Sequence, residues 1–284
     1  MALGKAELLY AMNLPPAQAV AFFERKGLVI TENWYDLLGE VHNRAFTVAQ
    51  VAKLNVLQDI RDAMLSAMEA GQTFSEFKKG LQPLLEQKGW WGQAIDSETG
   101  EILKTYPGTN RPVRYGDPQR LKLIYDVNLQ NAFMAGRRER QLSNIDDRPY
   151  WQYVAVMDSK TRPSHRALNG RVFRYDDPFW QSFYPPNGYR CRCRVRALSS
   201  DEVGIGSGQT PQSSSRGRLS WVNVPLSKTN PAAGTTNVRR FEYAPGQHVA
   251  TDAGWSHAPD AAPHPDLSRY HADLVAAYRK AVKP

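Results

Sequence analysis

Between residues 190 and 197 the chain reads Arg-Cys-Arg-Cys-Arg-Val-Arg-Ala, an alternation of basic and apolar side chains. Successive side chains of a β-strand point to opposite faces of the sheet, whereas a helix would scatter both sets. The alternation therefore predicts a half-buried strand whose thiols, Cys191 and Cys193, point inward. The outward face would carry a row of four arginines: Arg190, Arg192, Arg194 and Arg196.

The segments before this strand supply its neighbours. Residues 150–157 read Tyr-Trp-Gln-Tyr-Val-Ala-Val-Met, an aromatic and β-branched run that predicts another strand. It leads into a loop at 158–165, and Pro-Pro-Asn-Gly at 185–188 predicts a turn. Residues 158–198 hold nine Lys or Arg and three Asp, so this block carries +6 of the formal +8 of the chain.

The same block contains a candidate metal site. It holds both cysteines of the chain and one histidine, which follows the loop that starts at Asp158. Thiolate, imidazole and carboxylate groups bind zinc in tetrahedral sites, and a site with four protein ligands is structural. We therefore expect a structural zinc. Its four predicted ligands are Asp158, His165, Cys191 and Cys193.

Another interpretation of these residues needs no metal. Free cysteine is among the most buried residue types, so both thiols would be ordinary core side chains. Cys-x-Cys is also a less usual zinc spacing than Cys-x-x-Cys. Asp158 would then pair with Arg162. In this alternative the loop is held by hydrogen bonds among four side chains: Asp158, Thr161, Arg162 and His165.

The arginine row also has two interpretations. Guanidinium groups bind phosphates and carboxylates through paired hydrogen bonds. The row formed by Arg190, Arg192, Arg194 and Arg196 would then contact either a DNA backbone, without reading its sequence, or an acidic protein surface. Alternatively, it is a solvated face without a partner. The net charge of +8 favours an acidic partner.

Several protein classes are disfavoured by the sequence. No apolar run reaches about eighteen residues, so no contact with a membrane is expected, and the N-terminus has no signal-peptide pattern. Two cysteines are too few for a disulfide framework, so reduced thiols in a cytoplasm are expected. No phosphate-binding loop, Gly-x-Ser-x-Gly or His-Glu-x-x-His occurs, so we expect a protein that is not an enzyme.

The remaining chain predicts an α+β fold with a helical N-terminal part. Residues 1–89 are predicted to be all helical, with a capping box at Thr73 and Glu76 opening the last helix and Pro83 kinking it or ending it early. Residues 90–116 predict a loop or hairpin arm. The predicted helices of the first part cover about 15–26, 33–48, 48–70 and 73–89.

The second half combines one long helix with a small antiparallel sheet. Asp117 and Pro118 start the helix, which runs to about residue 142, and Gly136 allows a neighbouring element to approach it closely. Residues 117–198 thus form the core that carries the Cys/His motif. Residues 199–284 are rich in Gly, Ser, Pro, Thr and Asn, which predicts an extended linker that ends in an amphipathic helix.

Three motifs occur in a specific order. Asp-x-x-Thr-Arg-Pro-x-His-x-x-Leu-x-Gly starts at 158, Phe-Trp follows at 179, and Pro-Pro-Asn-Gly-Tyr-Arg-Cys-Arg-Cys starts at 185. In this order they resemble the phage Mu F family of minor head, or head morphogenesis, proteins. The resemblance extends over about residues 30 to 200. The matching positions are Asp158, Thr161, Arg162, Pro163, His165, Leu168, Gly170, Phe179, Trp180, Pro185, Pro186, Gly188, Cys191 and Cys193.

The resemblance implies a phage minor head protein. Proteins of this family associate with the portal and the procapsid and assist head morphogenesis, DNA packaging or ejection. The expected partners are therefore the portal protein and the major capsid or scaffold proteins, with the DNA backbone as a further candidate. The expected location is the virion, after assembly in the host bacterial cytoplasm. The alternative is a metal-dependent enzyme acting on nucleic acid, a nuclease with His165, Asp158 and the thiols around its ion.

Overall fold

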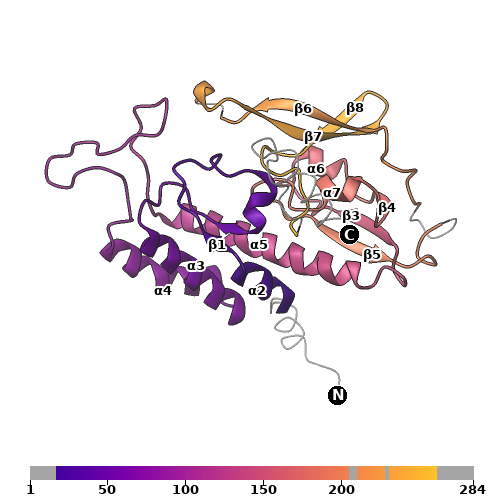
Figure 1. Ribbon diagram of the computed structural model, residues 1–284, viewed down its shortest axis with the longest axis horizontal. Helices are drawn as coiled ribbons and strands as arrows, with labels where there is room; N and C mark the ends of the chain where they lie inside the picture. Colours follow the sequence, from indigo (N-terminus) through magenta and orange to yellow (C-terminus); the bar gives the residue numbers. More distant parts are fainter. Residues whose placement is uncertain (1–16, 205–209, 228–229, 261–284) are drawn as a thin grey trace, which may run out of the picture.

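The chain folds into a group of helices beside two small antiparallel sheets (Figure 1). This computed structural model describes residues 17–204, 210–227 and 230–260. The α+β class predicted from the sequence is confirmed. Among the described residues, no helix is both long enough and apolar enough to cross a membrane. The amphipathic helix predicted at about 267–282 lies outside the described residues.

The helical part has its own hydrophobic core. In α3, buried side chains recur at helical spacing, as Val56, Ile60 and Met64 show. The side chains of four helices meet in this one cluster, which gives each helix a buried face. These helices are α2 (Ala17–Glu24), α3 (Leu54–Glu69), α4 (Phe74–Gln87) and α5 (Pro118–Leu142).

The starts of α4 and α5 are set by side chains that cap them. The Thr73 hydroxyl accepts a hydrogen bond from the Glu76 N–H at 3.4 Å, and the Glu76 carboxylate accepts one from the Thr73 N–H at 2.7 Å. This is the predicted capping box. Asp117 caps α5 by accepting hydrogen bonds from two backbone N–H groups, as its position before a proline predicted. α4 continues through Pro83, so the predicted early end is wrong.

Gly136 lets α2 and α5 approach each other closely, as predicted. A Cβ atom at this position would lie 2.8 Å from the backbone nitrogen of Ala19 on α2.

We expect Gly136→Ala to lower the free energy of unfolding by about 1–3 kcal/mol, because the added methyl group pushes the two backbones apart. Gly80→Ala is the matched control, because a Cβ there meets nothing within 4 Å. In α4 it should raise stability by about 0.5–1 kcal/mol, and chemical denaturation would measure both changes.

The helix predicted at 33–48 does not form, so residues 1–89 are not all helical. Two local features compete with it. The Asp36 carboxylate accepts hydrogen bonds from the backbone N–H groups of Glu32 and Asn33, and Gly39 adopts a left-handed φ of 67°. The observed elements are β1 (Gly27–Leu28), η1 (Gly39–Asn43) and β2 (Ala45–Phe46), and β1 pairs parallel to β2.

Residues 90–116 form an elongated loop that projects from the helices (Figure 1). Isolated β-bridges join its sides, at Gln93–Arg114, Ile95–Ile102 and Thr105–Pro112. Ala94 and Val113 are buried near its base, whereas Leu103 is 63% exposed and Ile102 is 45% exposed. The projection therefore has a packed base and presents large apolar side chains to solvent.

The first sheet carries the Cys/His block. Its strands, in spatial order, are β4 (Val172–Arg174), β3 (Tyr150–Val154) and β5 (Arg194–Leu198), and neighbours are antiparallel. The register places Tyr153 opposite Val195, and both side chains are fully buried. The aromatic side chains of α7 (Phe179–Phe183) pack against this sheet, so the core beside it is largely aromatic.

The expectation that residues 199–284 form an extended linker is wrong for the part that the structure describes. A second antiparallel sheet lies there, in the order β6 (Leu219–Pro225), β7 (Thr235–Ala244) and β8 (Gln247–Ala250). Phe241 on β7 is fully buried. Its ring centroid lies 6.0 Å from that of Phe173 and 5.1 Å from that of Phe179. The second sheet thus completes the aromatic core of the first.

Polar contacts also tie this second segment to the core. The buried Asp177 carboxylate accepts hydrogen bonds from the Ser214 hydroxyl and the Ser215 N–H, both at 2.9 Å. Further along, Arg162 forms an ion pair with Asp252 at 2.7 Å. This segment has the composition of a linker. It is ordered here because its apolar side chains, its serines and Asp252 find partners in residues 150–198.

Candidate metal centre

Two separate segments bring the candidate ligands together. His165 lies on the short helix α6 (Pro163–Arg166), which follows the loop after β3. Cys191 and Cys193 lie in the loop before β5, because that strand starts only at Arg194. The strand predicted from residue 190 is therefore too long, although the predicted burial holds, with both thiols buried and all four arginines exposed.

The loop before β5 cannot continue the strand because of its backbone. Arg190 has a φ of 60°, in the left-handed region that interrupts a strand. Gly188 lies beneath the ion pair of Arg162 and Asp252, where an added Cβ would come within 2.5 Å of Arg162 Nη1. The loop is thus folded around this ion pair, and the fold turns both thiols toward α6.

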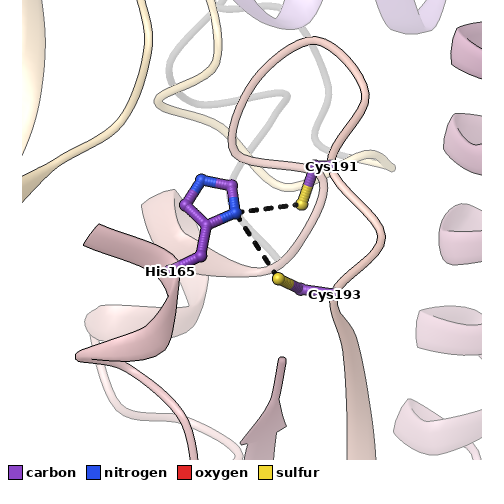
Figure 2. Close-up of side chains that lie close together, drawn as sticks. All are labelled: His165, Cys191 and Cys193. Atoms are coloured by element: carbon purple, nitrogen blue, oxygen red, sulfur yellow. Dashed lines mark hydrogen bonds between the residues drawn. The ribbon is translucent and has the colours of Figure 1, made fainter. Parts of the chain in front are cut away.

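Both thiols point at one ring nitrogen of His165 (Figure 2). The distance from Nδ1 to Sγ is 3.7 Å for Cys191 and 3.5 Å for Cys193. The ligand atoms of the three residues all lie within 4.8 Å of one another, and all three side chains are buried. These three residues, His165, Cys191 and Cys193, are called the His/Cys cluster below.

The distances in the His/Cys cluster fit a metal better than hydrogen bonds alone. Zn–S bonds of about 2.3 Å and Zn–N bonds of about 2.0–2.1 Å at a tetrahedral angle place S and N about 3.6 Å apart. A neutral imidazole nitrogen that accepts has one lone pair, so it cannot receive two well-directed thiol hydrogen bonds at once. One ion between the three atoms would satisfy all of them.

The two thiols differ in acidity. A side-chain hydrogen bond from Cys193, followed by the contact with His165, holds the pKa of Cys191 well below its usual range. The same hydrogen bond raises the pKa of Cys193, and burial raises it further. The pair therefore favours a thiolate at Cys191. Thiolates are the form in which cysteine binds zinc.

Asp158, the fourth predicted ligand, does not join the cluster. Its carboxylate instead forms a two-point ion pair with Arg192, at 2.6 and 2.8 Å. These hydrogen bonds hold the pKa of Asp158 well below its usual range. The predicted pairing with Arg162 is also wrong, because Arg162 binds Asp252. Asp158 lies beside the row of arginines, so its carboxylate pairs with the nearest guanidinium, that of Arg192.

The predicted arginine row is only partly available to a partner. Arg192 binds Asp158, and Arg196 forms an ion pair with Glu202 at 2.7 Å. Among the described residues, Arg190 and Arg194 have no ion-pair partner. Binding of DNA or of an acidic protein by these four arginines therefore stays a prediction, with two of the four charges already neutralised.

A cavity of about 400 Å³ opens beside the His/Cys cluster. Its wall includes all three residues of the cluster. Lys160, Arg162 and Tyr189 also contribute to it, and the sequence did not single out Lys160 or Tyr189 as site residues. Their sequence positions carry no signal for this role, because the cavity forms only when the loops at 158–162 and 187–193 meet.

The protein is thus an α+β protein in which a His/Cys cluster joins the short helix α6 to the loop before β5. Residues 58–196 match the family described as "Phage Mu protein F like protein". That range contains α4, α5 and the whole His/Cys cluster, together with most of α3 and most of the first sheet. Residues 58–196 of this chain belong to the family of phage Mu F-like proteins.

Two curated relatives extend the likeness beyond that range. "Putative capsid assembly protein F" of Escherichia phage Mu is 41% identical over 256 residues, which cover 90% of this chain and 56% of the relative. "Mu-like prophage FluMu F protein" of Haemophilus influenzae is 41% identical over 230 residues, which cover 80% of this chain and 52% of the relative. The chain thus spans about half the length of these relatives. No solved structure matches it significantly.

Proposed function

We propose that this protein takes part in assembling the head of a Mu-like bacteriophage. The observation that carries the proposal is its 41% identity, over 90% of the chain, to a protein named for capsid assembly. The aligned length is too great for the likeness to be confined to the His/Cys block. The aligned residues include most of the helical core, most of both sheets and the segments that connect them.

The finer role is that of a minor head protein. In this role the protein contacts the portal and the major capsid or scaffold proteins, assists DNA packaging or ejection, and stays in the virion after assembly in the host cytoplasm. The projection at 90–116 supports contact with another protein, because Ile102 and Leu103 are exposed apolar side chains on it. Exposed apolar groups of this kind gain most when a partner covers them.

Within this role, the His/Cys cluster holds a zinc ion that stabilises the fold. The nitrogen–sulfur distances of 3.7 and 3.5 Å support the assignment. The ion joins α6 to the loop before β5, two segments that are 26 residues apart at His165 and Cys191. Closing such a loop removes conformational freedom from the unfolded chain. The zinc centre has three protein ligands among the described residues, instead of the four that the sequence predicted.

The head assembly proposal is tested in a phage that encodes this protein. Heads are purified from cells infected with one of three phages: the wild type, a phage that lacks the gene for this protein, and a phage that carries Leu103→Ser. The wild-type protein should be present in purified heads, and the deletion should lower the yield of heads. Leu103→Ser should reduce incorporation without a change in melting temperature. Met157→Ser is the matched control, because Met157 is exposed to a similar extent, 59% against 63% for Leu103, but lies outside the projection. Normal heads that lack the protein would overturn the proposal.

A metal-dependent nuclease is the second candidate function. The cavity beside the cluster favours it, because a catalytic metal needs an open position. Against it, the nearby Asp158 carboxylate is engaged by Arg192, so it cannot readily hold a second ion or accept a proton. Incubation of the protein with DNA and Mg²⁺, Mn²⁺ or Zn²⁺ separates the two functions. Cleavage that His165→Ala abolishes would establish the nuclease, and no cleavage is expected.

A further inference from the structure

The cavity beside the His/Cys cluster is strongly basic. Its wall includes four cationic side chains, and none of the described residues that line it is acidic. The pocket therefore attracts anions whether or not the cluster holds a metal. The four cations are Lys160, Arg162, Arg190 and Arg192.

The cluster leaves one coordination position unfilled by the described part of the chain. Zinc takes four ligands, and the structure brings three His, Cys, Asp or Glu side chains together here among its described residues. The buried Tyr153 hydroxyl donates its hydrogen bond to Asn187 at 2.8 Å, so it is already engaged. Because all three ligands line the same basic cavity, an ion between them borders that cavity.

Two of the four cations are neutralised by ion pairs, and the other two are not. Arg192 is paired with Asp158, and Arg162 is paired with Asp252. Lys160 and Arg190 have no ion-pair partner among the described residues, and both are exposed. A zinc ion with two thiolate ligands adds no net charge. The excess positive charge at the mouth of the cavity therefore comes from these two side chains.

A second cavity, of about 750 Å³, shares part of this basic wall. Lys160, Arg190 and Arg192 line both cavities. The second one adds the aromatic side chains of Phe133 and Trp255. Cations beside aromatic rings are the combination that binds phosphates and stacks bases along a single nucleic-acid strand.

We propose that the fourth position of the zinc centre takes an oxygen of a phosphate group, which Lys160 and Arg190 hold in the basic cavity. The inference rests on the proposed zinc centre. Phosphate oxygens suit both contacts, because they bind divalent metals and accept charge-assisted hydrogen bonds from Lys and Arg. A strand of nucleic acid and a free phosphate share this chemistry.

Cobalt(II) in place of zinc reports on this site directly. The full-length protein is loaded with Co²⁺, and its absorption is recorded during titration with inorganic phosphate. Thiolate-to-cobalt charge transfer should appear on loading, and the visible ligand-field bands should shift as phosphate enters the fourth position. Bands that form but do not respond to phosphate would overturn this inference and leave the metal centre intact. No thiolate–cobalt band at all would overturn the metal centre and this inference with it.

Charge variants test the part played by the cavity. Lys160→Gln and Arg190→Gln should each weaken phosphate binding about tenfold, since each removes one charge-assisted hydrogen bond. Both should keep the cobalt spectrum of the phosphate-free protein. Arg194→Gln is the matched control, because Arg194 is exposed on β5 and lines neither cavity. Equal affinities in all three variants would contradict the proposal.

A short single-stranded oligonucleotide distinguishes the two sources of phosphate. If the site serves a nucleic-acid strand, the oligonucleotide should shift the cobalt bands at lower concentration than inorganic phosphate, and Trp255→Ala should remove that advantage. If the site serves free phosphate, inorganic phosphate should bind better and Trp255→Ala should change nothing. Either result supports a phosphate at the metal, and no shift with either probe overturns it.

Discussion

Removing the zinc proposed for the His/Cys cluster should lower the melting temperature of the protein by about 10–20 °C. Structural zinc sites contribute binding free energy of the order of 10 kcal/mol to small folds. In a chain with two hydrophobic cores, we expect about half of that to appear as stability. Each kcal/mol corresponds to about 2–4 °C in a protein of this size. Thermal melting with and without a strong chelator, followed by addition of zinc, measures the effect.

Two variants sharpen this experiment. His165→Ala should melt at the temperature of the chelated wild type and should no longer respond to chelator, because it removes the nitrogen ligand. Asp158→Ala is the matched control. Its carboxylate binds Arg192 outside the cluster, so the variant should keep its response to chelator. A wild-type protein that melts at the same temperature with and without chelator would mean that the two thiols are ordinary buried side chains.

Phe241→Ala should lower the free energy of unfolding by about 3–5 kcal/mol. The ring is fully buried and contacts Phe173 and Phe179 of the first core. Its loss leaves a cavity between the two sheets. Trp221→Ala on the neighbouring strand β6 is the matched control, because Trp221 is 56% exposed. Its ring lies under the Arg239 guanidinium, so the control should cost only about 0.5–1 kcal/mol.

Chemical denaturation of both variants provides the measurement. If the two substitutions cost the same, the second sheet does not share the core of the first. Truncation after Leu198 gives a further comparison, since it removes Phe241 together with the whole second sheet. The truncated chain should lose its cooperative transition, because the aromatic rings beside β4 and α7 would be exposed to water.

Most of the helices could be predicted because their signals are local, although the helix predicted at 33–48 does not form. The capping box at Thr73 and the cap at Asp117 depend on residues within one helical turn, and both are found in the structure. The second sheet could not be predicted in the same way. In β7 the buried residues are Val238 and Phe241, three positions apart, so the strand has no two-residue alternation. Its order depends on partners more than forty residues earlier in the chain.

The candidate site was predictable in part, for a related reason. The burial of Cys191 and Cys193 and the choice of His165 as their fellow ligand follow from the sequence, and the structure brings the three residues together. Asp158 was included because it precedes His165 in the motif, but the partner of a carboxylate is set by the nearest cation in space. Lys160 and Tyr189, which also line the basic cavity, were missed because the cavity forms between loops whose meeting no local pattern specifies.

The central claim is that His165, Cys191 and Cys193 bind one zinc ion, and X-ray absorption at the zinc edge tests it most directly. The measurement uses the full-length protein purified without chelator, after its metal content has been determined. We expect one zinc per chain, two sulfur neighbours at about 2.3 Å, and nitrogen or oxygen neighbours at about 2.0–2.1 Å. Protein that contains no zinc, or zinc without sulfur neighbours, would contradict the claim.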